Sequence, residues 1–186
     1  MSTKDKATPE NSARNAEAHD NTPEIFDDVL VPEKDAPKVL TLPPNILLLA
    51  IIAGLVLNWI FPLDWGRTWG GLGLIILILS LGLIFWCKKL FDDAGTNIRP
   101  DEPSLTLITE GPYMYSRNPV YLGFLSGFAG LAMLANAPIM LLILIPLFFA
   151  LQHYVVKPEE TYLEEKFGSE YRNYMDMTKR WITIPR

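Results

Sequence analysis

The chain has 186 residues, of which 49% are hydrophobic and 20% are charged, and its formal net charge is −5. Residues 39–63, 68–87 and 118–156 contain no Asp, Glu, Lys or Arg, and because a membrane-spanning helix needs about 20 predominantly apolar residues, this pattern excludes a soluble single-domain enzyme. The single cysteine, Cys87, excludes a secreted disulfide scaffold, and the chain has no basic patch interleaved with aromatic residues that would indicate a nucleic-acid partner.

Residues 1–40 are predicted to be a disordered acidic tail. Residues 1–38 carry nine acidic and five basic side chains, and residues 1–24 have almost no large apolar side chain. Such a segment buries too little apolar surface to offset the entropy cost of ordering it. The remaining residues, 41–186, are predicted to form a membrane domain.

This domain is predicted to be an all-α polytopic membrane bundle of four transmembrane helices. The spans are expected at residues 45–61, 69–86, 119–134 and 138–156. The last two spans would form a C-terminal hairpin, because only a short turn separates them. Residues 157–182 are expected to be a cytoplasmic helical segment, with a break at Gly168.

Lysine and arginine residues near the predicted span ends favour one orientation in the membrane. On one side of the bundle lie Lys34, Lys38, Lys88, Lys89, Arg99, Arg117 and Lys157. Only Arg67 would lie on the other side. Because cytoplasmic loops carry an excess of Lys and Arg, we expect both termini to be cytoplasmic and the long polar segments to face the cytoplasm.

The polar segment before the third span contains the first candidate for binding chemistry. Gly111-Pro112 predicts a turn, and Pro119 suits the first turn of a helix. Tyr113, Tyr121 and Arg117 would then cluster at the membrane surface beside a helix N-terminus. The unpaired N–H groups and partial positive charge of that terminus can hold a carboxylate or phosphate. An interfacial belt, in which Tyr and Arg anchor the span, is the alternative for the same residues, and physical arguments alone favour it.

The second candidate lies at the end of the fourth span. Glu159 and Glu160 follow Pro158 and suit the first turn of a helix, but one carboxylate could instead face the tyrosines and receive a cationic ligand. His153 is the one histidine in the uncharged stretch 118–156 and is a functional candidate by its depth, although snorkelling to the interface also explains it. No residues have the spacing of a metal site.

Two motifs flank the predicted hairpin. The first is Gly111-Pro112-Tyr113-x-Tyr115-x-Arg117-Asn118-Pro119-x-Tyr121, and the second is Glu159-Glu160-x-x-Leu163-x-x-x-Phe167-Gly168-x-x-Tyr171-x-x-Tyr174. In this order and at this separation, they resemble the isoprenylcysteine carboxyl methyltransferase family, which groups with the phospholipid methyltransferases. Residues 95–100 resemble those of its small bacterial members.

The resemblance implies an integral-membrane methyltransferase of the bacterial inner membrane that uses S-adenosyl-L-methionine and releases S-adenosyl-L-homocysteine. It implies a cofactor pocket at the cytoplasmic face and a lipid-like or hydrophobic methyl acceptor that enters from the bilayer. The residues carried over as cofactor contacts are Leu105, Thr106, Leu107, Ile108, Tyr113, Asn118, Pro119, Val120, Tyr121 and Glu159. The candidate catalytic residues are Glu159, Arg117 and His153.

Departures from the family pattern leave the acceptor open. Eukaryotic members have His where Leu105 and Asn118 stand, and the prenyl-protein enzymes have a substrate-linked Arg where this chain has Val155. A phospholipid amine or a thiol is therefore an alternative acceptor to a prenylcysteine carboxylate. Less favoured alternatives are a protein related to the membrane sterol reductases, which use a nicotinamide cofactor, and a non-catalytic membrane bundle.

Overall fold

A computed structural model describes residues 42–184 of the chain, so the tail predicted at residues 1–40 lies outside the described residues. Within residues 42–184 every regular element is a helix, and no strand is present. The elements are α1 (Pro43–Ile60), η2 (Arg67–Trp69), α2 (Gly70–Asp93), η3 (Gly111–Met114), α3 (Pro119–Leu134), η4 (Pro138–Ile143), α4 (Leu144–Leu151), η5 (Gln152–Val156), α5 (Lys157–Phe167) and α6 (Ser169–Met177).

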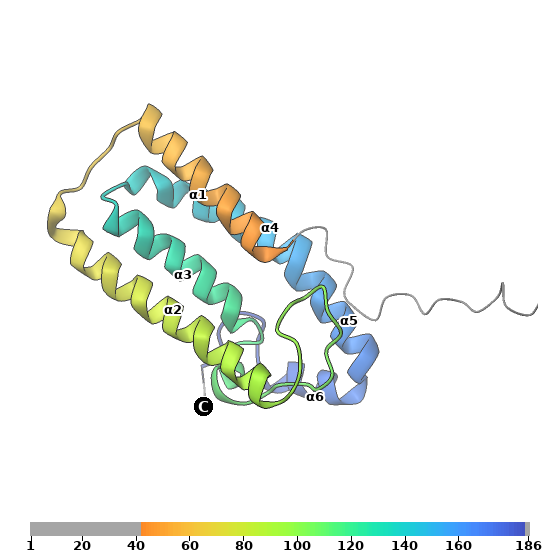
Figure 1. Cartoon of the computed structure of the whole chain (residues 1–186). Coiled ribbons are helices and arrows are strands. Elements are labelled where there is room, and N and C mark those ends of the chain that lie inside the picture. The colour runs from red at the N-terminus through yellow and green to blue at the C-terminus, as the bar shows by residue number, and fades with distance from the viewer. Residues whose placement is uncertain (1–41, 185–186) are drawn as a thin grey trace, which may run out of the picture. The chain divides into compact units, whose positions relative to one another are not determined.

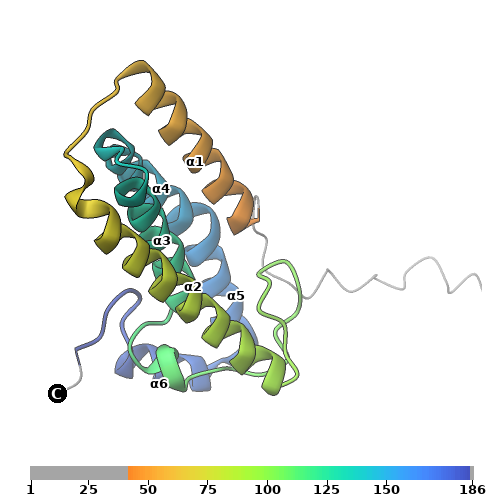
Figure 2. The same ribbon diagram turned by 60° about the vertical axis from the view of Figure 1, so that its left-hand side comes forward.

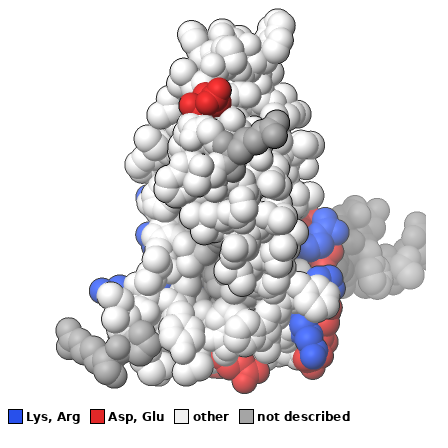
Figure 3. Space-filling view, turned by 90° about the vertical axis from the view of Figure 1, so that its left-hand side faces the viewer, with Lys and Arg blue, Asp and Glu red and all other residues white. Residues whose placement is uncertain are grey.

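The helices have the length and composition of an integral membrane protein. Three stretches are long and apolar enough to cross a bilayer, namely α1, α2 and the continuous helical run Pro138–Phe167. Helix α3 is apolar but has only 16 residues. Many large apolar side chains of α1 and α2 point outward, such as Leu49, Trp59 and Phe85. In the space-filling view of Figure 3 the body is almost free of charge, and most charged side chains gather at one end.

The helix bounds differ from the predicted spans in two places. Helix α2 continues to Asp93 rather than ending at residue 86, because residues 87–93 contain no Gly or Pro and Lys88 pairs with Asp92 one turn later. The predicted fourth span and the segment after it form one continuous run, in which the π-helix η5 leads directly into α5. Pro158, the second residue of α5, cannot donate a backbone hydrogen bond to the preceding turn.

The end of the chain also differs from the expectation. The helix breaks at Gly168, whose φ of 54° favours glycine, as the sequence predicts. Helix α6 then ends at Met177, so the helical segment is shorter than the expected 157–182. Residues after Met177 are not helical because their backbone groups bond with the loop that precedes α3.

Close packing of α2 against α3 forms the centre of the bundle. A Cβ built on Gly73 would lie 2.5 Å from the backbone nitrogen of Leu134 and 2.7 Å from the carbonyl oxygen of Gly130. Small residues permit such backbone contact between membrane helices. Ser80 and Ser126 add a hydrogen bond of 2.8 Å across the same interface.

We expect Gly73→Ala to lower the midpoint of thermal unfolding in detergent, because the new methyl group collides with backbone atoms that cannot move aside. Overpacking of this kind costs about 1–3 kcal/mol. The matched control is Gly71→Ala in the same helix, where a Cβ would have no neighbour within 4 Å. Equal unfolding midpoints for the two variants would contradict the proposed role of Gly73.

Four separate segments meet at the charged end of the bundle. The end of α2, the start of α3, α5 and α6 lie together at the lower end of Figure 1, and Figure 2 shows the same grouping from another side. The non-helical loop between α2 and η3 borders the same region. This convergence places the two sequence motifs beside each other.

Candidate active site

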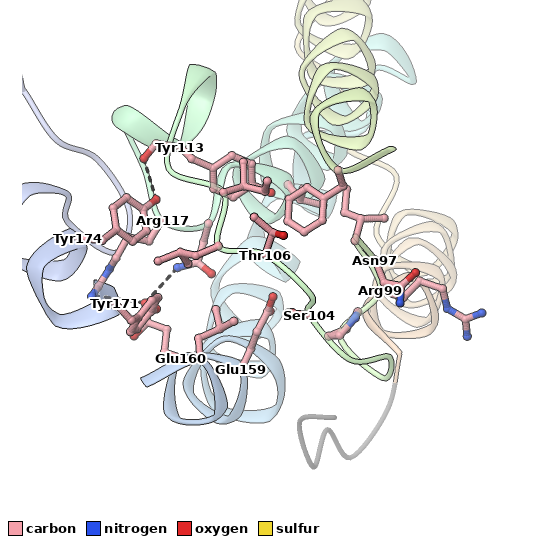
Figure 4. Close-up of a pocket in the computed structure, with 18 of the residues that line it drawn as sticks. Asn97, Arg99, Ser104, Thr106, Tyr113, Arg117, Glu159, Glu160, Tyr171 and Tyr174 are labelled. Atoms are coloured by element: carbon pink, nitrogen blue, oxygen red, sulfur yellow. Dashed lines mark hydrogen bonds and ion pairs between the residues drawn. The ribbon is translucent and has the colours of Figure 1, made fainter. Parts of the chain in front are cut away.

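A narrow cavity of about 60 Å³ lies where these segments meet. Figure 4 shows Glu159 pointing into it from α5, opposite Thr106 of the loop. Both sequence motifs contribute to its walls, as does the loop after α2. The lining residues are Phe91, Asn97, Ile98, Arg99, Pro100, Ser104, Thr106, Leu107, Ile108, Tyr113, Arg117, Asn118, Val120, Tyr121, Glu159, Glu160, Leu163, Tyr171 and Tyr174.

The cavity brings together most of the residues that the sequence singled out. Nine of them line it: Thr106, Leu107, Ile108, Tyr113, Arg117, Asn118, Val120, Tyr121 and Glu159. Leu105 does not, because its backbone N–H bonds to Thr96 while its side chain is 63% exposed. Pro119 does not either, because it is buried as the first residue of α3.

The structure does not bring His153 to the cavity. This residue lies in the π-helix η5, where its side chain is exposed and its Nδ1 lies 2.9 Å from the carbonyl oxygen of Phe149. The neighbouring Val155 and Val156 are fully buried, so His153 occupies the outward face of the same turn. Within the described residues, no group of three or more His, Cys, Asp or Glu side chains could hold a metal ion.

Glu159 is partly buried and has one hydrogen-bond partner on α3. The hydroxyl of Tyr121 donates to its Oε2 at 2.7 Å. This bond joins residues 38 positions apart in the chain and occupies one carboxylate oxygen. The remaining acceptor sites of the carboxylate leave it able to interact with a cation in the cavity.

Glu160, the neighbouring acid, is 7% exposed and sits in a dense polar network. Its Oε2 accepts hydrogen bonds from Nε and Nη2 of Arg180 at 2.9 and 2.6 Å. Its Oε1 lies 3.3 Å from Nη2 of Arg117 and accepts a hydrogen bond of 3.3 Å from Nδ2 of Asn118. Two cations surround one carboxylate, so this part of the site has an excess of positive charge.

Arg117 has a free donor beside the cavity. Its side chain is only 10% exposed, and its Nε–H is buried without a hydrogen-bond partner in the described part of the chain. Buried polar atoms without partners are rare in folded proteins, and each calls for an explanation such as a catalytic role or a bound water or ion. The N-terminus of α3, at Pro119, starts two residues later and adds its own partial positive charge. The arrangement suits an anionic group.

Three tyrosines form the wall near η3 and α6. The hydroxyl of Tyr174 donates to the carbonyl oxygen of Tyr113 at 2.7 Å. Burial raises the pKa of Tyr113, Tyr171 and Tyr174 above the ordinary value for a phenol. These hydroxyl groups therefore stay protonated at physiological pH and act as neutral hydrogen-bond donors.

The first part of the loop after α2, from Asn97 to Ser104, forms a part of the wall that the predicted cofactor contacts did not include. It is held by several polar contacts: the Ser104 N–H donates to the Tyr162 hydroxyl on α5 at 3.2 Å, and Asn97 Nδ2 donates to the carbonyl oxygen of Pro103 at 3.2 Å. Arg99 points away from the cavity centre in Figure 4 and pairs with Asp101 and Glu102. For this first part of the loop, the sequence signal is the resemblance of residues 95–100 to a family stretch.

Arg180, which binds Glu160, is a second residue near the site that the sequence did not reveal. It lies 20 residues after Glu160 and follows the last helix, so no periodic pattern connects the two. A buried acid between two arginines can be recognised only when the fold has brought the three residues together.

An apolar groove of about 380 Å³ adjoins the cavity. It runs between the start of α1 and the second half of α2, with Pro43, Ile84 and Phe124 among its walls and Lys88 at its edge. Five residues line both spaces: Ile98, Arg99, Pro100, Val120 and Tyr121. The groove and the polar cavity therefore meet at Tyr121.

Comparison with known proteins decides the family. The sequence model of the phospholipid methyltransferases matches residues 68–170, which is more than half of the chain and includes both motifs up to Glu170. The chain belongs to the phospholipid methyltransferase family. The cavity described above is thus the candidate functional site of this family member.

The chain is also similar to a curated protein and to a solved structure. An uncharacterized protein of Haemophilus influenzae is 47% identical over 32 residues, which cover 17% of this chain and 51% of that protein. The solved structure of the eukaryotic intramembrane Ras methyltransferase ICMT, an isoprenylcysteine carboxyl methyltransferase, is 20% identical and has a TM-score of 0.57. That match covers 76% of this chain and 52% of the other, so the chain spans about half the length of each relative. At 20% identity, the similarity to ICMT shows a shared fold and nothing more.

Proposed function

We propose that this phospholipid methyltransferase family member transfers a methyl group from S-adenosyl-L-methionine to a lipid-like or hydrophobic acceptor. One observation carries the proposal: a single cavity is lined by Glu159, which brings a carboxylate, and by Arg117, whose Nε–H has no partner in the described part of the chain. A ligand that carries both a cationic and an anionic group fits this pair of charges.

The residues present fit the cofactor. Arg117 and the N-terminus of α3 would hold its carboxylate, and Glu159 would face its positively charged sulfonium. Apolar side chains such as Leu107, Ile108 and Leu163 would contact its adenine. When bound, S-adenosyl-L-methionine supplies an electrophilic methyl group. The chain binds and orients the two reactants, and positioning by itself can supply much of the rate.

The cavity must widen for such a ligand. At about 60 Å³ it has room for only a few water molecules, each of which takes roughly 30 Å³. Its wall, residues 94–110, is not helical and is held by polar contacts together with the packing of Ile98, Leu107 and Ile108. We expect this wall to open and to close again over the ligand, as loops at active sites commonly do.

The apolar groove supports a lipid-like acceptor. Its walls are mostly apolar, and the helices that border it expose apolar side chains to their surroundings. An acceptor with a hydrocarbon chain could therefore enter from the bilayer and reach the cavity at Tyr121, where the two spaces meet. The acceptor classes are a prenylcysteine carboxylate, a phospholipid amine and a thiol.

The proposed topology has four spans, with α3 as the short one and the run from Pro138 to Val156 as the last. Residues 41–186 would form the methyltransferase domain, and residues 157–184 would lie at the cytoplasmic face with the active site. The arginine and lysine side chains at the site end support this orientation. Both termini would then be cytoplasmic, and the protein would belong to a bacterial inner membrane.

Calorimetry on the detergent-purified full chain tests the cofactor assignment. We expect S-adenosyl-L-homocysteine to bind with an affinity tighter than about 1 mM, which corresponds to roughly −4 kcal/mol. Hydrogen exchange on the same complex should slow within residues 97–108 and around Glu159. The absence of binding at millimolar ligand, or binding of NADPH instead, would overturn the proposal and favour a reductase-related or non-catalytic protein.

Methyl transfer into a membrane lipid extract identifies the acceptor class. Radiolabel carried as a carboxyl methyl ester is released by mild base as methanol, whereas label on an amine nitrogen or a thioether sulfur is stable. We expect the label to appear in lipid that partitions into organic solvent. Incorporation only into water-soluble acceptors would contradict a lipid-like substrate.

A further inference from the structure

The last described part of the chain, residues 178–184, forms a strap across the loop that precedes α3. The backbone N–H of Arg117 donates to the carbonyl oxygen of Lys179 at 3.1 Å. The backbone N–H of Thr183 donates to the carbonyl oxygen of Tyr115 at 2.7 Å. Ser116 Oγ and Asn118 Nδ2 both donate to the carbonyl oxygen of Arg180, at 3.3 and 3.1 Å. The strap is therefore bonded to the segment that ends at the N-cap of α3.

Two side chains of the strap reach in the other direction, toward the helix that carries the acids. Arg180 binds Glu160 through both Nε and Nη2. The Nε1–H of Trp181 donates to Oε1 of Gln152 at 2.9 Å, and its ring lies 4.9 Å from the ring of Phe148, measured between centroids. The strap thus contacts the acidic turn of α5 and the helix about two to three turns before it.

Gln152 is the first residue of the π-helix η5, which immediately precedes α5. A π turn contains one residue more than an α turn, so its presence rotates the residues that follow by about 100° around the helix axis. The directions of Glu159 and Glu160 therefore depend on whether this turn persists. The bond from Trp181 lies at the position where the π turn begins.

We propose that the strap is a positioning element, in which Arg180 and Trp181 hold the acids of α5 and the start of α3 in their binding arrangement. Neither residue lines the cavity, so neither would touch the reactants. Both act through other residues: Arg180 through Glu160, and Trp181 through Gln152. The expected effect of the strap on the affinity for the cofactor rests on the proposed function.

The test uses the full chain in detergent with four variants. Arg180→Gln removes the charge, Arg180→Lys keeps it without the two-point contact, and Trp181→Phe keeps a ring against Phe148 but removes the N–H donor. The matched control is Arg172→Gln, because Arg172 is an exposed arginine whose ion pair with Glu164 is 3.8 Å long. Thermal unfolding first establishes that each variant is folded.

Hydrogen exchange without any ligand is the first measurement. We expect Arg180→Gln and Trp181→Phe to speed exchange within residues 114–122 and 152–160, with residues 73–85 of α2 unchanged. Arg180→Lys should lie between Arg180→Gln and the wild type, and Arg172→Gln should match the wild type. Exchange equal to wild type in both Arg180→Gln and Trp181→Phe would overturn the inference, whether or not the protein binds the cofactor.

Calorimetry with S-adenosyl-L-homocysteine is the second measurement. We expect Arg180→Gln to weaken binding about tenfold, the scale of one hydrogen bond to a charged group, and Arg180→Lys to restore part of the loss. If the wild type binds and every folded variant binds equally well, the inference about the strap fails and the proposed function stands. If the wild type does not bind, the proposed function fails, and the exchange data alone decide the role of the strap.

Discussion

Glu159→Gln is expected to weaken the binding of S-adenosyl-L-methionine by about tenfold or more while the protein stays folded. The substitution keeps the size of the side chain and an oxygen that can accept the hydrogen bond from Tyr121. It removes the negative charge that would face the sulfonium. Because charges interact more strongly in a partly buried site than in water, this loss should dominate the effect.

Comparing S-adenosyl-L-methionine with S-adenosyl-L-homocysteine isolates the effect of the Glu159 charge on the sulfonium. S-adenosyl-L-homocysteine lacks the sulfonium charge, so Glu159→Gln should weaken its binding less than that of S-adenosyl-L-methionine. Glu165→Gln, on the exposed side of the same helix, is the matched control and should leave both affinities unchanged. An equal loss for both ligands would show that Glu159 does not sense the sulfonium, and no loss for either would remove it from the binding site.

Glu160→Ala, unlike Glu159→Gln, is expected to act mainly by destabilising the folded protein. Truncation would remove the acceptor that Arg180 and Arg117 share and would leave the guanidinium of Arg117 buried without a counter-charge. Breaking a buried ion pair by removing one partner costs about 3–5 kcal/mol. We therefore expect a strongly lowered midpoint of thermal unfolding in detergent and a low yield of folded protein.

Glu164→Ala, one turn further along α5, provides the control for this loss. Its ion pair with Arg172 is half exposed and 3.8 Å long, and exposed pairs contribute at most about 1 kcal/mol. A midpoint for Glu160→Ala close to that of Glu164→Ala would contradict the structural role of Glu160.

The contrast between Glu159 and Glu160 shows what local sequence can and cannot resolve. Both follow Pro158, and both suit a helix first turn, so a motif identifies the pair but not the task of each. Their separation by one residue turns them about 100° apart on a helix. Glu159 therefore meets Tyr121 of α3, whereas Glu160 meets the strap.

The sequence by itself determined that the chain is helical and enters a membrane. A bilayer core offers no partners for backbone N–H and C=O groups, so uncharged stretches of this length can only be helices. The start of α3 at Pro119 and the break at Gly168 followed from the special backbone properties of proline and glycine. The two motifs contain nine of the 19 residues that line the cavity.

Only the tertiary structure decided which of these residues share one cavity and what holds them. The π-helix η5 turns His153 outward, and no sequence pattern marks such a turn. The loop wall, the partners of Glu160 and the strap depend on contacts between residues far apart in the chain, whose energy exists only after the helices have packed. Local patterns report the preferences of neighbouring residues, whereas this site is built from long-range contacts.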